Sequence, residues 1–225
     1  MTDNNTTPTP TRQNGPPLLI PAIVMAVFTA ASAALGATAA RYDSANLLAY
    51  TQTHHISQLI LGTLVFGTAL PLLIWSATVY RRLHRLGVTA PGTAIAFGGG
   101  LLASASLAIS GLLTWTTAQL NGSADVVRAL TALGFAAGGP GFVVPFAMLI
   151  AGVAVPGLIL RLLPTTLAWT GLIIAALGAL ATFALLTPAL DVLLPVGRFA
   201  GLIWLLIVSV KLPLTRHRNN QLVNA

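Results

Sequence analysis

Six long apolar stretches dominate this chain of 225 residues, and they restrict its fold more than any other feature. An α-helix rises about 1.5 Å per residue, so about 20 apolar residues cross the roughly 30 Å hydrocarbon core of a bilayer. The stretches are long enough for this, and only short links separate them. The sequence therefore predicts an all-α, polytopic membrane helix bundle with six transmembrane helices. The stretches cover residues 18–40, 56–80, 93–117, 126–160, 165–187 and 195–212.

The composition agrees with this prediction. Apolar residues make up 56% of the chain and charged residues only 7%, whereas an ordinary soluble domain carries about 25% charged residues. The absence of cysteine excludes disulfides, thiolate metal sites and thiol catalysis. A formal net charge of +7 often indicates a nucleic-acid partner. Here the basic residues lie between the apolar stretches, so membrane topology explains them and no nucleic-acid partner is expected.

The ends of the chain differ from its middle. Residues 1–17 are rich in Asn, Thr and Pro, which predicts a disordered polar N-terminal tail. Residues 18–213 form the predicted six-helix transmembrane domain, and residues 214–225 a short basic cytoplasmic tail. The small-x-small pattern Ala37-Thr38-Ala39 allows a second interpretation, in which the first stretch is a cleaved signal peptide. Its apolar region exceeds the usual length of about 7–15 residues, which favours a transmembrane helix.

The distribution of Lys and Arg predicts the orientation, because short cytoplasmic loops carry an excess of both. Both termini are predicted to be cytoplasmic. That side would hold eight basic residues, namely Arg12, Arg81, Arg82, Arg85, Arg161, Lys211, Arg216 and Arg218. The outer side would hold Arg41, Arg128 and Arg198. Six of the inner residues form a candidate collar for anionic lipid headgroups: Arg81, Arg82, Arg85, Lys211, Arg216 and Arg218.

Small residues, rather than ionisable ones, fill the apolar stretches. Proton pumps and ion-coupled carriers place ionisable side chains near the middle of the membrane, so their scarcity here argues against a proton-coupled carrier. Gly, Ala and Ser recur from Gly98 to Gly111, in Gly134-x-x-x-Gly138, and in the fifth stretch. Small residues at this spacing let helices approach closely. We expect tight packing within the chain; the alternative is a face for an oligomer or a partner protein.

The fourth stretch is too long for one helix across the membrane. Its 35 residues would span about 52 Å, and a typical tilt of about 20° does not absorb that excess. Pro140 lacks an amide donor and clashes with the carbonyl of residue 136. We therefore expect a broken helix with a cavity beside it, since irregular backbone in a membrane lies where its carbonyls are satisfied; the alternative is a simple kink. The candidate hinge comprises Gly138, Gly139, Pro140, Gly141 and Pro145.

Two adjacent histidines precede the second stretch and, with two nearby residues, form a candidate outer polar cluster of Asp43, Tyr50, His54 and His55. A structural zinc site needs about four ligands, and neighbouring helical residues point in different directions. We expect one histidine to face water and the other to be hydrogen-bonded at the helix start, with pH sensing as the functional alternative. The sequence contains no HExxH, Walker or dinucleotide-binding motif, so it predicts no catalytic, cofactor-binding or metal residues.

Several short motifs resemble one known group, the uncharacterised multi-pass integral membrane proteins of high-GC Gram-positive bacteria, a domain-of-unknown-function family. The matching segments are Asp43–Leu48 with Tyr50 and His54, Tyr80–Leu83, Ala96–Gly100, Leu133–Pro140, Leu163–Gly171 and Gly201–Trp204. The resemblance covers about residues 18–213. It implies a compact helical bundle in the bacterial plasma membrane, and it supplies no activity, ligand or catalytic residue.

Three functions agree with these features. The first is a non-enzymatic accessory or scaffold subunit that packs against itself or partner membrane proteins. The alternative is a small transporter or channel for a neutral or amphipathic solute, which would pass between stretches two to five. The third is an intramembrane lipid-modifying enzyme. A carrier requires a polar cavity reaching mid-membrane, and an enzyme requires reactive groups gathered at one depth; an accessory subunit requires neither.

Overall fold

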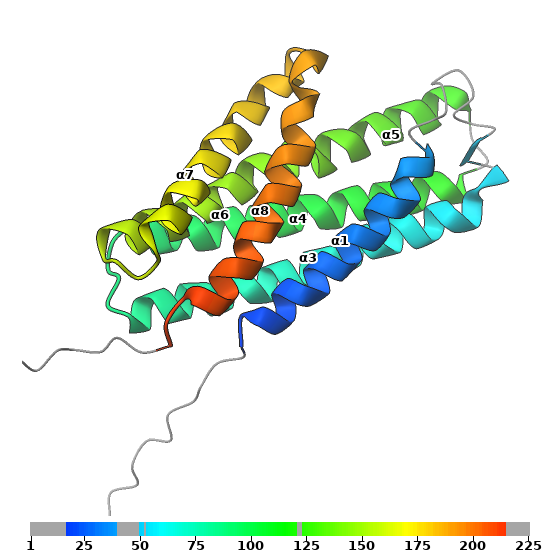
Figure 1. Cartoon of the computed structure of the whole chain (residues 1–225). Helices are drawn as coiled ribbons and strands as arrows, with labels where there is room; N and C mark the ends of the chain where they lie inside the picture. Colours follow the sequence, from blue (N-terminus) through cyan, green and yellow to red (C-terminus); the bar gives the residue numbers. More distant parts are fainter. Residues whose placement is uncertain (1–16, 40–49, 52, 121–122, 215–225) are drawn as a thin grey trace, which may run out of the picture.

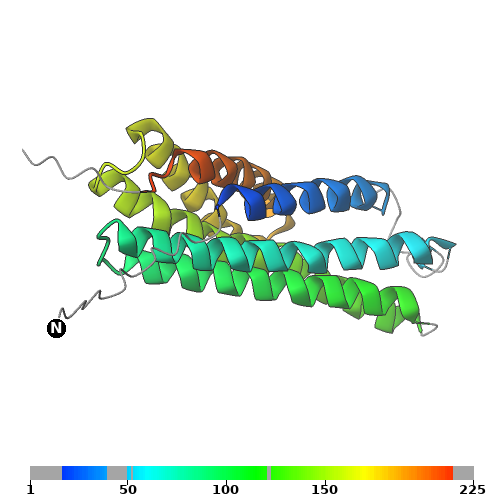
Figure 2. The same cartoon turned by 90° about the horizontal axis from the view of Figure 1, so that it is seen from below.

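Helices account for nearly all of the chain that the structure describes. A computed structural model describes residues 17–39, 50–51, 53–120 and 123–214, and no strand occurs among them (Figures 1 and 2). Six helical segments in this part are long and apolar enough to cross a membrane, so the predicted all-α membrane bundle is confirmed. The elements are α1 (Leu19–Ala39), α3 (His55–Arg85), α4 (Gly92–Gln119), α5 (Ala124–Gly138), α6 (Pro140–Ile159), α7 (Thr165–Leu180), η2 (Ala181–Leu185), η3 (Pro188–Val192) and α8 (Leu193–Lys211).

The first helix begins at the end of the bundle where the last helix stops (Figures 1 and 2). The α3–α4 and α6–α7 links lie at this same end, which we call the terminal end (Figure 1). The opposite end, where α4 stops and α5 starts, is the far end. Three predicted features lie outside the described residues: the N-terminal tail except for residue 17, Asp43, and the basic tail except for residue 214. Arg216 and Arg218 belong to that basic tail.

Both links at the terminal end reverse the chain through a residue at positive φ, Gly87 (84°) and Arg161 (52°). The amide that follows Gly87 donates to the Leu83 carbonyl at 3.1 Å, and the amide that follows Arg161 donates to the Gly157 carbonyl at 2.9 Å. These bonds satisfy carbonyls that the helix ends leave free, as in a Schellman motif. A proline then precedes the next helix in both links. The two turns thus have the same backbone pattern, although only one uses glycine.

Small residues of α4 hold it between α3 and α6. A Cβ added to Gly111 would lie 2.5 Å from the Phe66 amide nitrogen of α3. A Cβ added to Gly99 would lie 2.6 Å from the Pro145 carbonyl oxygen of α6. Real Cβ atoms do not approach this closely, so the backbones meet only because these positions are glycine. The small residues of this stretch therefore pack within the chain, as expected; Gly98, which faces open space, is an exception.

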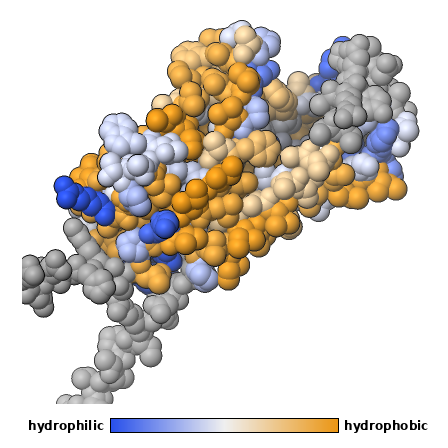
Figure 3. Space-filling model, viewed as in Figure 1, coloured by the Kyte–Doolittle hydropathy of each residue, from blue (hydrophilic) through white to orange (hydrophobic). Residues whose placement is uncertain are grey.

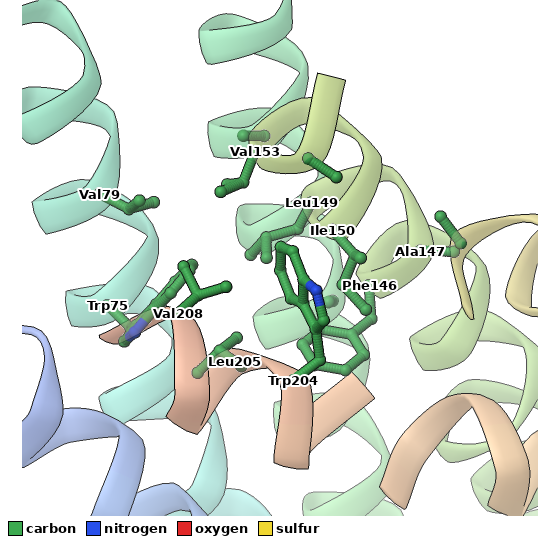
Figure 4. Close-up of a cluster of buried hydrophobic side chains, with 14 of the residues drawn as sticks. Trp75, Val79, Phe146, Ala147, Leu149, Ile150, Val153, Trp204, Leu205 and Val208 are labelled. Carbon is green, nitrogen blue, oxygen red and sulfur yellow. The ribbon is translucent and has the colours of Figure 1, made fainter. Parts of the chain in front are cut away.

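Two tryptophans anchor the buried core between α3, α6 and α8 (Figure 4). The indole N–H of Trp75 donates to the Ser209 hydroxyl at 2.8 Å, and that of Trp204 donates to the Leu167 carbonyl at 2.8 Å. Gly171 of α7 leaves room for the Trp204 ring, since a Cβ there would lie 2.6 Å from it. Both indoles are fully buried with their polar atom satisfied, so packing explains them without a ligand.

The outward faces of the bundle are apolar. Large side chains such as Ile74, Leu102, Ile159 and Ile203 are exposed. On the face shown in Figure 3, apolar residues cover the middle and the most hydrophilic residues lie toward the ends. Without a membrane these exposed side chains would be unfavourable in water, whereas in a bilayer they contact lipid. The surface therefore matches an integral membrane protein.

Candidate functional site: a cavity beside the broken helix

The fourth apolar stretch forms two helices that meet at Gly139. This residue has φ −90° and ψ −103°, far from helical values of about −63° and −42°. Pro140 has no amide, and the Phe142 amide donates to the Gly139 carbonyl at 3.1 Å. The break expected in this stretch is therefore present, whereas its action as a hinge stays a prediction.

Side chains from two other helices donate to carbonyls in the last turns of α5. The Ser110 hydroxyl of α4 donates to the Gly134 carbonyl at 2.8 Å, and the Arg198 guanidinium of α8 donates to the Gly138 carbonyl. The Phe142 amide donates to Gly139 rather than to Gly138, so the Gly138 carbonyl lacks its helical partner and requires such a donor in a membrane. A cation at this point also lies favourably at the negative end of the α5 dipole. The break thus joins α4, α5 and α8 in one polar layer.

A cavity of about 440 Å³ opens beside this layer, between the far halves of α1, α3, α4 and α8, the second half of α5 and one residue of α6, Val143. Apolar side chains such as Leu61, Val65, Leu130 and Leu194 form part of its wall. Ser110 lies nine residues before the end of α4, about 14 Å along the helix. The cavity therefore extends from the far end toward the middle of the membrane. Its polar lining comprises Tyr50, Thr51, Gln58, Ser110, Thr114, Thr117, Thr131 and Arg198.

The hydroxyl groups that α4 and α5 contribute to the cavity donate their protons to backbone carbonyls. Thr114 donates to the Ser110 carbonyl at 2.9 Å, Thr117 to the Leu113 carbonyl at 2.7 Å and Thr131 to the Val127 carbonyl at 2.8 Å. Such bonds to the preceding turn are common for Ser and Thr in membrane helices. The oxygen lone pairs are left to accept hydrogen bonds. These hydroxyls therefore favour a ligand that carries its own N–H or O–H donors.

Arg198 is the charged residue among the described residues that line the cavity. Its guanidinium is half-buried, and the Cζ atom lies 4.8 Å from the centre of the Phe142 ring. Within the described segments the structure shows one ion pair, the exposed Arg128–Asp125 contact at 4.0 Å, and Arg198 takes no part in it. No carboxylate of the described chain therefore neutralises Arg198.

The five candidate hinge residues divide into two groups. Gly138 and Gly139 line the cavity at the break. Pro140 is buried as the first residue of α6, and Gly141 and Pro145 follow within that helix. A Cβ on Gly141 would lie 2.9 Å from the Ala136 carbonyl, so this glycine also permits the close turn. Pro145 instead packs where α6 meets α4.

Of the candidate outer polar cluster, the structure brings Tyr50 and His54 together. Tyr50 is buried and lines the cavity. The Nδ1 atom of His54 lies 3.3 Å from the Tyr50 carbonyl, and the two rings stack with centroids 4.6 Å apart. His55 is exposed at the start of α3, so the two histidines differ as expected. In the described ranges, no three His, Asp or Glu side chains lie close enough to hold a metal ion.

The described members of the candidate lipid collar lie at the terminal end. Arg81, Arg85 and Lys211 are exposed. The Arg82 guanidinium donates to the Leu212 carbonyl at 3.4 Å, which connects the end of α3 to the end of α8. Arg82 thus contributes to packing at the terminal end.

The cavity corrects one expectation about the solute route. The sixth stretch, not the fifth, completes the wall, because α8 contributes Arg198 and no described lining residue comes from α7. The sequence interpretation grouped Arg198 with the outer basic residues and gave it no site role. The available signal was its position inside the sixth apolar stretch, where a charge needs a specific partner.

Comparison with protein-family models, curated proteins and solved structures found no match for this chain.

Proposed function

We propose that this integral membrane protein binds a small amphipathic solute in the cavity and acts as a small transporter or channel for it. The cavity at the broken helix is the observation that carries this proposal. Its volume of about 440 Å³ lies in the range of small-molecule sites, about 300–1,000 Å³. It combines apolar walls from several helices with hydroxyl oxygens and one guanidinium, so both parts of an amphipathic molecule find a matching surface.

The helix break supports a transport role rather than simple binding. Many transporters form their binding site at discontinuous helices near mid-membrane, where backbone groups contact the solute. Here Gly139 separates α5 from α6; α5 carries Thr131 and Gly134 on the cavity wall, whereas α6 contributes only Val143 to the described lining. A change of backbone angles at Gly139 would move α5 relative to the core, where α6 is firmly packed. That movement would alter access to the cavity.

Two other functions have less support. The described small residues at the helix crossings pack within the chain, so they do not by themselves support an accessory or scaffold subunit. A lipid-modifying enzyme would need a general base, whereas the described lining residues include no histidine or carboxylate. In our proposal the terminal end faces the cytoplasm of the plasma membrane, so that the cavity opens in the outer half of the bilayer and the basic collar contacts anionic lipid.

Photo-cross-linking tests the proposal. The probe is decanol with a diazirine in its chain, applied to the protein in phosphatidylcholine nanodiscs, and mass spectrometry then identifies the labelled peptides. We expect saturable labelling of α3 and α5 segments around Leu61 and Leu130. Thr131→Trp places a large ring at the edge of the cavity and is expected to remove this labelling. Ala132→Trp lies on the neighbouring exposed face of the same helix and is expected to retain it. Labelling spread evenly over exposed lipid-facing positions would contradict the proposal.

A further inference from the structure

Arg198 is built into the cavity by its surroundings. It lies in the second turn of α8, five residues after the helix begins at Leu193. Its side chain turns toward the core, since it reaches the Gly138 carbonyl of α5 and covers the Phe142 ring of α6. A lipid-facing arginine near a helix end would instead extend toward the membrane surface. The guanidinium is therefore held at the inner part of the cavity by contacts with two other helices.

These contacts leave most of the charge uncompensated. A guanidinium has five N–H donors, and the structure shows one hydrogen bond for it in the described chain. The negative end of the α5 dipole offsets only about half of an elementary charge. Among the other described charged groups toward this end, Asp125 and Arg128 pair with each other in solvent, and Asp191 of η3 forms no ion pair with Arg198. A charge held within a membrane protein at such a position generally marks a functional site with a specific partner.

The remainder of the lining limits what that partner is. The described lining residues include no acid, so a cationic ligand would meet Arg198 without a counter-charge. The Thr114 and Thr131 hydroxyls present acceptor lone pairs, which accept from donor groups on the ligand rather than stabilise its anionic group. Apolar walls formed by residues such as Leu61 and Val65 suit a short hydrocarbon chain.

We infer that the solute is an amphipathic anion, whose carboxylate, phosphate or sulfonate group binds Arg198 while its apolar part contacts the cavity wall. This inference rests on the proposed function and specifies its ligand class. Arg is suited to this role because its planar fork donates two parallel hydrogen bonds to such groups. The competing explanation is that Arg198 only caps the end of α5.

Competition on the unmodified protein tests the ligand class. The diazirine decanol probe labels the cavity in phosphatidylcholine nanodiscs, and two C10 competitors displace it: decanesulfonate and decyltrimethylammonium. Both carry a permanent charge and the same chain, so the difference between them lies in the headgroup, which is anionic in one and cationic in the other. We expect decanesulfonate to displace the probe at a concentration at least about tenfold lower than decyltrimethylammonium does, because Arg198 can donate charge-assisted hydrogen bonds to the sulfonate. Equal competition would overturn the inference.

Two variants separate anion binding from helix capping. Arg198→Gln removes the charge but keeps an N–H donor on a shorter side chain, and Arg198→Lys keeps the charge. We expect the Gln variant to retain decanol labelling and lose the preference for decanesulfonate, and the Lys variant to keep part of that preference. A Gln variant with unchanged preference would show that Arg198 only caps α5. If the Gln variant does not fold, the Lys variant and the competition on the unmodified protein still decide the question.

A membrane lipid and a soluble amphiphile share this chemistry, and a third competitor separates them. Phosphatidylglycerol added to the nanodiscs is expected to displace the probe if the solute is an anionic lipid, whereas competition by decanesulfonate alone indicates a soluble single-chain anion. Either result supports the inference. If neither phosphatidylglycerol nor decanesulfonate displaces the probe, the inference is wrong. Failure of the decanol probe to label the cavity would contradict the proposed function itself, so the two failures are distinguishable.

Discussion

Gly62 of α3 and Gly111 of α4 lie directly against each other where the two helices cross. A Cβ added to either glycine would lie 2.8 Å from the carbonyl oxygen of the other. The contact is therefore reciprocal, and it sets how closely the two helices approach. Because α4 also contacts α6 in this way, through Gly99, these glycines fix the position of the helix that carries Ser110 and the hydroxyl wall of the cavity.

We predict that Gly111→Ala destabilises the protein by about 1–3 kcal/mol, because the methyl group must force two backbones apart. Gly98→Ala provides the matched control, since it changes the same helix at a position facing open space. The control is expected to be neutral or stabilising by up to about 1 kcal/mol, because alanine favours a helix over glycine. Thermal unfolding of the purified variants in a mild detergent measures both. Equal effects would show that the glycine contact does not determine the packing.

The second prediction concerns Arg161, which adopts the left-handed conformation that glycine adopts at Gly87. A side chain in this region costs roughly 1–2 kcal/mol. We expect Arg161→Gly to stabilise the protein by about 1 kcal/mol and Gly87→Ala to destabilise it by a similar amount. Arg161→Ala should not stabilise, because its Cβ retains the strain. A stabilising effect of Arg161→Ala would indicate that the charge, not the backbone, is unfavourable there.

The number and position of the helices could be predicted because the bilayer fixes how long an apolar segment must be. The boundaries were less accurate. The second stretch was expected at residues 56–80, whereas α3 continues to Arg85, since backbone hydrogen bonding continues through charged residues until Gly87 reverses the chain. The fifth stretch was expected at residues 165–187, whereas α7 stops at Leu180 and a 3₁₀ turn follows. Hydropathy does not distinguish these two kinds of helix.

The candidate site could be predicted only where its cause is local. Gly139 and Pro140 break the helix through their own backbone chemistry, so the sequence alone indicated the break. The cavity depends on which faces of α1, α3, α4 and α8 meet α5, and no local pattern determines that. Arg198 shows the difference most clearly. Counting charges by loop assigned it to one side of the membrane, but the direction of its side chain follows from the freed carbonyl at Gly138, 60 residues away.

The third prediction tests the break as a hinge. In Gly139→Ala with Pro140→Ala, the new methyl group at position 139 would lie 2.8 Å from the Phe135 carbonyl in the present conformation, and alanine at 140 restores the missing amide donor. We expect a straighter segment that still folds but loses saturable decanol labelling of the cavity. Hydrogen exchange of the segment 136–143 measures the straightening, as slower exchange. Unchanged labelling in a variant shown to be straight would contradict a role for the break in binding.

The fourth prediction concerns the lipid collar. Replacing Arg81 and Lys211 with Gln removes two exposed charges from the terminal end and leaves the Arg82–Leu212 contact intact. A basic residue near an anionic surface contributes up to about 1 kcal/mol, so the double variant is expected to retain several-fold less phosphatidylglycerol. Native mass spectra of protein released from mixed-lipid nanodiscs measure the retained lipid. Arg128→Gln, an exposed change at the far end, serves as the control and should retain as much as the unmodified protein. Equal losses in both would indicate non-specific attraction.

The last prediction is the orientation. The chain contains no cysteine, so single cysteines report on one position each. Gly87 lies in the α3–α4 link at the terminal end, and Pro188 begins η3 between α7 and α8 at the far end. The excess of Lys and Arg at the terminal end predicts that this end is cytoplasmic. A membrane-impermeant maleimide is therefore expected to label Pro188→Cys in intact cells and Gly87→Cys only after lysis. Cysteines at positions 46 and 122, outside the described residues, should behave like Pro188→Cys. Labelling of Gly87→Cys in intact cells would reverse the topology and place the Arg198 cavity in the inner half of the membrane.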